Sequence, residues 1–239
     1  MQTFHFETIG IVHSCYSEKF GIPRQPGLSR AAEASLELLP PYNRPEAVKG
    51  LEGFSHIWIS FVFHGVKREE WRPTVRPPRL GGNQRIGVFA SRSTHRPNPI
   101  GLSVVELSRI ETAEGKVVLH LKGADLLDGT PVLDIKPYIP YVDSIPDALA
   151  GFADEAPQQR LSVRFSEAAR QSCQQLAAHY PRLQTLISET IGLDPRPAYQ
   201  AQSDKHREYG VSLCGLNIRF AVEGKTAEVI AIEEGSRQD

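Results

Sequence analysis

Residues 91–99 form a polar loop with two arginines between two apolar stretches of the chain. Pro97 and Pro99 each fix φ and push the preceding residue out of the helical region, so this loop is stiff. Guanidinium groups on a stiff loop can bind a ligand when a scaffold holds the loop in place. A long solvated hairpin loop is the alternative, but it needs neither two prolines nor two arginines, Arg92 and Arg96. The sequence therefore favours a binding role for this loop.

Three further polar segments lie close to apolar stretches. Residues 23–27 hold Arg24 and Gln25 between two prolines, His64 follows the most apolar stretch of the chain, and residues 128–131 contain an Asp-Gly turn. Taken singly, they are also explained as a turn with exposed polar tips, a structural histidine and an aspartate that caps its own turn. If the strands that carry them close into a barrel, the four segments form one polar pocket. Arginines, one acid and backbone groups suit a zwitterionic, nucleoside-like ligand better than a phosphate.

The sequence argues against metal and nucleotide sites of the common kinds. His56 and His64 would lie on the same face of a strand. They are eight residues apart, which is too far for both to bind one metal ion, so we expect no zinc site. No Gly-x-Gly-x-x-Gly follows a strand and no Gly-Lys-Ser/Thr loop occurs, which excludes a Rossmann cofactor site and a P-loop. Cys15, Cys173 and Cys214 lack CxxC spacing, and we interpret them as thiols in a reducing compartment.

The composition indicates a β-rich protein of the cytoplasm. With 19 glycines and 18 prolines in 239 residues, many turns are expected, which favours β architecture over a helical bundle. No secretion signal follows Met1, and the longest apolar run, residues 57–63, is too short to span a bilayer. Because the net charge is only −1, any surface that binds nucleic acid must be a local patch of the protein.

Residues 67–96 form a local basic segment. It contains eight lysines and arginines and only two acidic residues, together with Trp71 and several prolines and glycines. An extended, basic segment with an aromatic residue is typical of a surface that follows a phosphate backbone. A merely solvated basic loop is the alternative, which the scarcity of acids disfavours.

The elements that would position these loops are mostly strands. Alternation predicts strands over residues 4–12, 54–64, 86–89, 100–110, 116–122 and 132–135, with a hairpin between the 104–110 and 116–122 strands. Small and acidic residues at 146–157 mark a boundary. Beyond it the pattern predicts a strand over 161–165, a helix capped by Ser166, a second helix over about 181–191, a proline-rich loop at 194–199 and a three-stranded meander over 209–232. We therefore predict a β-barrel domain followed by a small α+β domain.

Several long motifs resemble the TrmO family. They are EKFGIPRQPG at 18–27, FSHIW at 54–58, WRPTVRPPRLGG at 71–82, GVFASRSTHRPNPIG at 87–101 and DGTPVLDIKPY at 128–138. The resemblance is dense over residues 1–147, the predicted methyltransferase domain. In the C-terminal domain, residues 148–239, it rests on the loop Asp194–Tyr199. It implies an S-adenosylmethionine-dependent tRNA methyltransferase built on a single-sheeted antiparallel β-barrel.

The resemblance also implies a reaction and a set of site residues. Family members methylate N6 of threonylcarbamoyl-adenosine at tRNA position 37, beside the anticodon, and pair as homodimers, so tRNA and a second copy are the expected partners, with no membrane and no metal. The residues expected to hold S-adenosylmethionine are Pro23, Arg24, Gln25, His64, Gly65, Arg92, Leu102, Asp128, Gly129, Thr130 and Pro131. The residues expected to grip tRNA are Arg72, Arg76, Arg79, Asp194, Arg196 and Tyr199.

Two residues are candidates for accepting the proton that the base nitrogen loses, or for orienting the base. Asp134 and Tyr138 follow the Asp128 turn in the sequence, although a packed barrel aromatic is an equal explanation of Tyr138. A non-catalytic RNA-binding or donor-sensing module is the alternative function. The combination of a full donor pocket with a basic surface favours the enzyme, because a sensor needs only the pocket.

Overall fold

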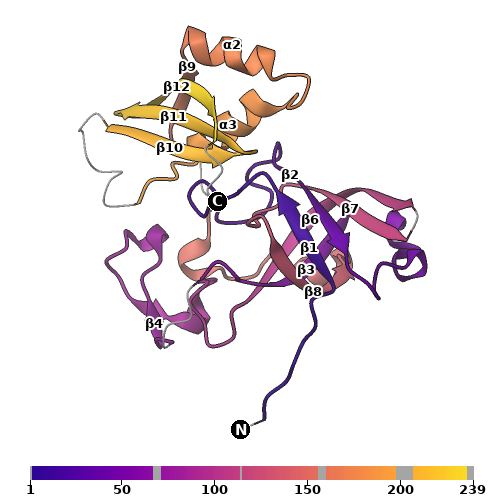
Figure 1. Ribbon diagram of the computed structural model, residues 1–239. Coiled ribbons are helices and arrows are strands. Elements are labelled where there is room, and N and C mark those ends of the chain that lie inside the picture. Colours follow the sequence, from indigo (N-terminus) through magenta and orange to yellow (C-terminus); the bar gives the residue numbers. More distant parts are fainter. Residues whose placement is uncertain (1, 67–70, 114, 156–159, 198–206, 236–239) are drawn as a thin grey trace.

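The computed structural model describes residues 2–66, 71–113, 115–155, 160–197 and 207–235. A barrel and a smaller sheet with two helices make up the chain, and the N-terminal residues extend away from the barrel (Figure 1). Each helix in the described part is too short or too polar to span a lipid bilayer.

Six antiparallel strands close the barrel in the order β1-β2-β7-β6-β3-β8. Along β3 the side chains alternate strictly, with Ile57, Ile59 and Phe61 pointing into the core and Trp58 and Ser60 pointing outward. This alternation is the pattern of a strand with one buried face, and it confirms the predicted barrel. The strands are β1 (Gly10–Ser14), β2 (Glu33–Leu38), β3 (His56–Val62), β6 (Ile100–Ala113), β7 (Lys116–Lys122) and β8 (Thr130–Pro137).

The predicted hairpin between β6 and β7 is confirmed, but other strand predictions were wrong. Residues 4–9 form no strand: Phe4 and Phe6 alternate, yet both are exposed and pair with no described strand. Residues 86–89 form only the two-residue β5 (Ile86–Gly87), which pairs with β4 (Thr74–Val75) outside the barrel. The reason is that Val88 is buried and turns into the short helix η4 (Val88–Ala90) while Phe89 faces solvent.

Short helical turns fill the connections. They are η1 (Pro45–Val48), η2 (Leu51–Gly53), η3 (Pro78–Leu80), α1 (Pro140–Asp143) and η5 (Gly151–Ala153). Three of them, η1, η3 and α1, begin with a proline at the first positions, where its missing N–H leaves no bond unmade.

The C-terminal unit is a four-stranded sheet in the order β10-β11-β12-β9 with two helices packed on it. The predicted meander is confirmed as β10 (Arg207–Leu213), β11 (Leu216–Glu223) and β12 (Thr226–Glu234), and β9 (Ser162–Phe165) joins it parallel to β12. The predicted cap is also confirmed, because Ser166 Oγ accepts the Ala169 N–H (3.1 Å) at the start of α2 (Glu167–Gln175). The second helix, α3 (Leu183–Gly192), packs against β9.

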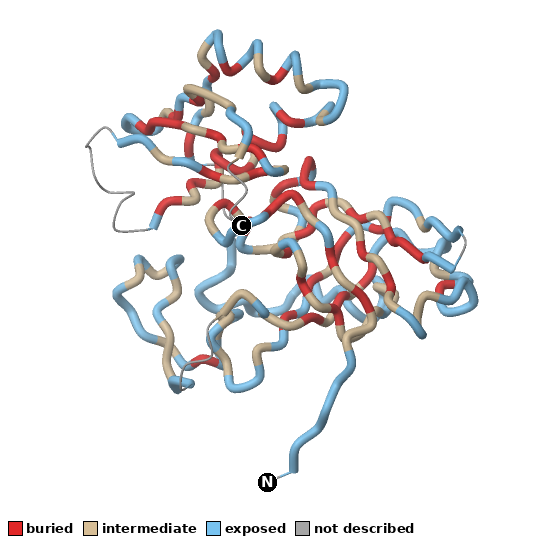
Figure 2. The backbone as a smooth tube through the Cα atoms, viewed as in Figure 1, coloured by how far each residue is buried: buried red, intermediate tan, exposed pale blue. Residues whose placement is uncertain are grey.

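The loop between β1 and β2, residues 15–32, belongs to both units in packing terms. Cys15, Tyr16, Ala31 and Ala32 are buried in the same hydrophobic cluster as the helices and strands of the C-terminal unit. Figure 2 shows buried residues both in the barrel and in the C-terminal sheet. The division at residue 147 stays a prediction, since this core draws side chains from both sides of it.

Candidate functional site

All four predicted polar segments lie at one end of the barrel. Because neighbouring strands are antiparallel, β1, β3 and β7 end where β2, β6 and β8 begin. This end, which we call the barrel mouth, carries residues 15–32 after β1, residues 63–66 after β3, residues 88–99 before β6 and residues 123–129 between β7 and β8. These segments are far apart in the sequence, and closure of the sheet brings them together.

Direct contacts join the segments at the mouth. The Arg92 guanidinium donates from Nη1 to Gln25 Oε1, which links the two proline-stiffened loops. Gly129 has φ +75° and lies against His64, whose Nε2 would be 3.9 Å from a Cβ at this position. Gly65 is closely packed, because a Cβ there would meet Leu127 Cδ2 at 2.9 Å and one of the two side chains would have to shift.

The turn at Asp128 is held by β1. The Ser14 N–H donates to Asp128 Oδ1 (2.9 Å), the Asp128 N–H to Tyr16 O (2.8 Å), and the Gly129 N–H to Val12 O (2.9 Å). The Asp128 carboxylate therefore accepts from β1, a distant segment of the chain. Its carboxylate is exposed on the other side and lies 3.8 Å from His13 Nδ1.

Sequence reasoning missed one acid at the mouth, Asp125. Its Oδ1 accepts from Ser103 Oγ (2.8 Å). Burial raises its pKa to about 6, against opposing effects that include the Ser103 hydrogen bond and the positive charge of Arg92. The available signal was an aspartate between two apolar residues, Ala124 and Leu126, outside any predicted strand.

The C-terminal unit reaches the mouth through Asp194 and Arg160. Partial burial and then the Arg160 charge lower the pKa of Arg24, whereas Asp194 raises it, so both groups lie near this guanidinium. Asp194 and Arg196 are each only 5% exposed and form a two-point ion pair, Nε to Oδ1 at 2.7 Å and Nη2 to Oδ2 at 3.0 Å. The arginine also lies 5.9 Å from the centre of the Tyr209 ring. Their buried side chains are satisfied by each other, and Tyr199 lies outside the described residues.

Three of the four arginines predicted to contact tRNA are exposed, and Arg196 is the buried one. Arg72, Arg76 and Arg79 lie on the segment that carries β4, β5 and η3, which projects from the barrel (Figure 1). The Arg79 Nη2 donates to the carbonyl of Glu155, which ties this arm to the connection between the two units.

The two catalytic candidates lie on the outer face of the barrel. Ser60 of β3 pairs with Leu102 on one side and with Asp134 on the other, which places these two about 10 Å apart across the sheet. Asp134 accepts from the Ile135 N–H (2.9 Å) and from Lys136 Nζ. Tyr138 lies roughly 13 Å further along β8 and packs against Trp58, with ring centres 6.0 Å apart. Asp134 thus lies midway along β8 and Tyr138 just past its end opposite the barrel mouth.

The residues at the mouth fit the methyl donor that the resemblance implies. That donor carries a carboxylate, an ammonium group and a sulfonium, and the mouth offers guanidinium groups at Arg24 and Arg92 and carboxylates at Asp125 and Asp128. A Cβ at Gly65 would collide with Leu127, so backbone there lines the mouth without a side chain. Among the described residues, no cluster of His, Cys, Asp or Glu could hold a metal ion.

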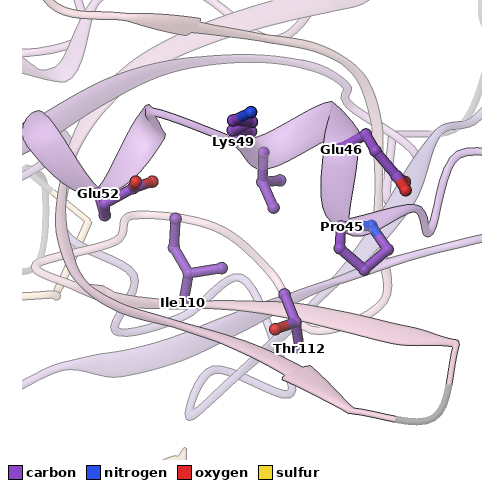
Figure 3. Close-up of a pocket in the computed structure, with 7 residues that line it drawn as sticks. Pro45, Glu46, Lys49, Glu52, Ile110 and Thr112 are labelled. Atoms are coloured by element: carbon purple, nitrogen blue, oxygen red, sulfur yellow. The ribbon is translucent and has the colours of Figure 1, made fainter.

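A hollow of about 430 Å³ lies at the opposite end of the barrel (Figure 3). It is bordered by the η1 and η2 turns and by Ile110 and Thr112 of β6, and it contains none of the predicted site residues.

Fold and sequence together define a β-barrel domain with a candidate small-molecule site at its mouth and a segment with exposed arginines, residues 71–87, beside it. The chain belongs to the TrmO family: the tRNA-methyltransferase O N-terminal domain matches residues 11–144 and the TrmO C-terminal domain matches residues 158–235. It is 50% identical over 98% of its length to a tRNA (adenine(37)-N6)-methyltransferase of Escherichia coli, of which it covers 99%. A human protein of the same name is 41% identical over 71% of this chain and 38% of its own length. A crystal structure of TrmO from Pseudomonas aeruginosa superposes with a TM-score of 0.81 at 40% identity, covering 98% of this chain and 99% of the other.

Proposed function

We propose that this protein transfers a methyl group from S-adenosylmethionine to N6 of the adenosine at tRNA position 37, with threonylcarbamoyl-adenosine as the accepting nucleoside. The Escherichia coli relative of nearly equal length is named for methyl transfer to adenine 37. Relatives in Pseudomonas aeruginosa are named as S-adenosylmethionine-dependent methyltransferases. We place the reaction in the cytoplasm, where tRNA is modified.

The observation that carries the proposal is the meeting of four separate polar segments at the barrel mouth. Arg92 contacts Gln25, His64 lies against Gly129, and Asp128 is held by β1. A structural loop cluster needs no such set of fixed arginines and acids, whereas a charged nucleoside ligand requires it. The exposed arginines of the adjacent arm add a surface for phosphates.

Each group at the mouth has a role that follows from its chemistry. When bound, the donor supplies an electrophilic methyl group on a positively charged sulfur. Arg24 and Arg92 bind a carboxylate by charge-assisted hydrogen bonds, and Asp128 offsets positive charge. Backbone around Gly65 and Gly129 allows a flat ring to approach closely. The remaining cofactor contacts are those of Pro23, Gln25, His64, Leu102, Thr130 and Pro131.

The accepting nitrogen must lose a proton as the methyl group arrives. Asp134 is our candidate acceptor, because it lies on the same outer face as Leu102. Tyr138 would then stack on or orient the base from its position beside Trp58. Rate acceleration would come mainly from holding donor and base in line in a site that excludes water.

We assign different tasks to the residues proposed for tRNA. Arg72, Arg76 and Arg79 are exposed and suited to phosphate contacts. Asp194 and Arg196 are paired and buried, so we propose that they brace the C-terminal loop beside Arg24 and that Tyr199 makes the tRNA contact.

We further propose a homodimer. Large apolar side chains are exposed on η4, on β6 and in the segment that contains and follows α1, and such side chains are commonly buried when two subunits associate. The Trp58 Nε1–H donates to Asp143 Oδ2 (3.0 Å), which fixes the α1 segment against β3 within this surface. The exposed residues are Phe89, Ile100, Leu102, Tyr141, Val142, Ile145 and Leu149.

The direct test is incubation of the pure protein with S-adenosylmethionine and tRNA, followed by mass spectrometry of the nucleosides. We expect a methyl group on threonylcarbamoyl-adenosine, and none when tRNA lacks the threonylcarbamoyl group. Arg92→Ala should abolish donor binding in calorimetry, whereas Arg109→Ala, an exposed arginine paired with Glu111 away from the mouth, should bind normally. Donor binding without methyl transfer to any tRNA would refute the proposal and favour a sensing module.

A further inference from the structure

Two cysteines from opposite halves of the chain lie against each other at the junction of the two units. Cys15 directly follows β1 and is 8% exposed, and Cys214 lies in the turn between β10 and β11 and is half-buried. The Cys214 N–H donates to Cys15 O (2.8 Å), and the two thiols are hydrogen-bonded to each other.

The backbone geometry suits a disulfide. The backbone hydrogen bond from Cys214 to Cys15 brings the two chain segments into direct contact, and disulfides join residues whose Cα atoms are as close as about 4.4–6.8 Å. The junction is also well braced around the pair: Ser17 Oγ and Ser212 Oγ are 2.7 Å apart, and the Ser212 N–H donates to Glu18 Oε1 (2.8 Å). These contacts hold the two cysteines side by side, which is the arrangement that a disulfide requires.

We propose that Cys15 and Cys214 are a redox site, which forms a reversible disulfide between the barrel and the C-terminal unit when a peroxide oxidises the protein. The inference rests on these contacts alone and holds whether or not the methyl-transfer proposal is correct.

The two thiols have different chemical roles. The hydrogen bond to Cys214 raises the pKa of Cys15, and burial raises it further, while the same bond lowers the pKa of Cys214. Cys214 is also the more exposed of the two. Cys214 is therefore the thiol that reacts first, because the thiolate is the nucleophile, and Cys15 is the thiol that resolves the product.

The reaction with hydrogen peroxide is balanced in two steps. The Cys214 sulfur attacks one peroxide oxygen, the O–O bond breaks, and a sulfenic acid and one water form, with the thiol proton going to the departing oxygen. The Cys15 sulfur then attacks the Cys214 sulfur, the S–O bond breaks, and the departing hydroxide takes the Cys15 proton as a second water. Peroxide gains two electrons, one from each sulfur, and an external dithiol returns them by disulfide exchange.

The bond would lock the contact between the units beside the site. Cys15 lies between Ser14 and Tyr16, whose backbone groups hold Asp128. A disulfide would also close a loop of about 200 residues, for which the unfolded chain loses much conformational freedom. We therefore expect the oxidised protein to melt at a higher temperature than the reduced one.

The test is a tryptic map of the wild-type chain after brief treatment with hydrogen peroxide and blocking of remaining thiols. We expect a linked pair of peptides 1–19 and 208–219, with peptide 171–182 blocked as a free thiol, and loss of the link after dithiothreitol. Cys173→Ser, which changes the buried cysteine of α2, should keep the link and the rise in melting temperature. Cys214→Ser should lose both.

Three outcomes would overturn the inference. They are a link to Cys173, a link between two copies of the chain, and oxidation of Cys214 to the sulfinic acid with Cys15 still a thiol. The map of the wild-type protein decides between them even if a serine at position 15 or 214 impairs folding.

Discussion

The buried carboxylate of Asp125 should make the free energy of unfolding depend on pH. Its pKa is raised from 3.8 to about 6, chiefly by burial. A difference of about two pKa units corresponds to about 3 kcal/mol between the two protonation states. This is an upper value, because the side chain is not wholly removed from water and Arg92 offsets part of the cost.

The direction of the pH dependence follows from the linkage between proton binding and folding. Since the folded pKa is higher than the unfolded one, the folded protein holds this proton more tightly. Its contribution to the free energy of unfolding is fully present below about pH 4 and is lost as the pH rises through 6. Asp125→Asn removes the titration but keeps the size of the side chain. The variant should therefore gain stability relative to wild type as the pH rises from 4 to 7, by up to about 3 kcal/mol.

Urea unfolding followed by tryptophan fluorescence measures this difference, because both tryptophans, Trp58 and Trp71, belong to the barrel half of the chain. Asp147→Asn, which changes an exposed acid beyond the barrel, is the matched control and should leave the difference flat with pH. A flat difference for Asp125→Asn as well would mean that the carboxylate is not desolvated in the folded barrel. A stability gap that closed with rising pH would reverse the sign and refute the reasoning.

Three further substitutions test the packing. Asp194→Ala leaves the buried guanidinium of Arg196 unpaired and should cost about 3–5 kcal/mol in urea unfolding, with the double alanine variant costing less than this single one. Gly101→Ala should destabilise the barrel by about 1–3 kcal/mol or more in thermal unfolding, because a Cβ there would lie 2.2 Å from Phe61 Cζ. Ser166→Ala removes the cap of α2 and should cost about 1 kcal/mol, whereas Ser166→Asp should retain most of the stability; a larger loss for aspartate would contradict the capping role.

Strands that were predictable from sequence have one strictly buried face. β3 alternates and β7 is nearly all apolar, so the local pattern identified both strands although β3 pairs with β6 and β8, which are distant in the chain. β2 was missed because its sequence, EASLEL, buries only Leu36 and Leu38 deeply and pairs with β7, more than 80 residues away. The strand predicted at residues 4–8 was wrong for the opposite reason. These residues alternate, but without a partner strand their apolar side chains are not buried.

The loops of the candidate site could be predicted from the sequence, but the contacts that surround them in the folded protein could not. Prolines beside Arg24 and Arg92 are visible in the sequence because they restrict the chain locally. Asp125 could not be assigned, since its raised pKa comes from burial, which only closure of the barrel produces, and its partner Ser103 lies on a strand that is distant in the sequence. The pairing of Asp194 with Arg196 was also hidden, because an arginine two residues from an aspartate in a proline-rich loop is expected to face solvent.

The connection from β1 to β2 ties these findings together. Its first residues hold the Asp128 turn, Arg24 and Gln25 follow in the same loop, and its last residues are anchored by α3, where Glu189 Oε2 accepts the Ala31 N–H (2.8 Å) and the Ser29 hydroxyl (3.0 Å). A shift of the C-terminal unit therefore cannot leave the mouth unchanged, since the loop that shapes the site is packed in the core of that unit. Recognition of tRNA by the C-terminal unit would reach the donor site through this loop. Glu189→Gln, which weakens the anchor without creating a cavity, should then reduce methyl transfer more than donor binding; equal losses in both would place the loop in the donor site alone.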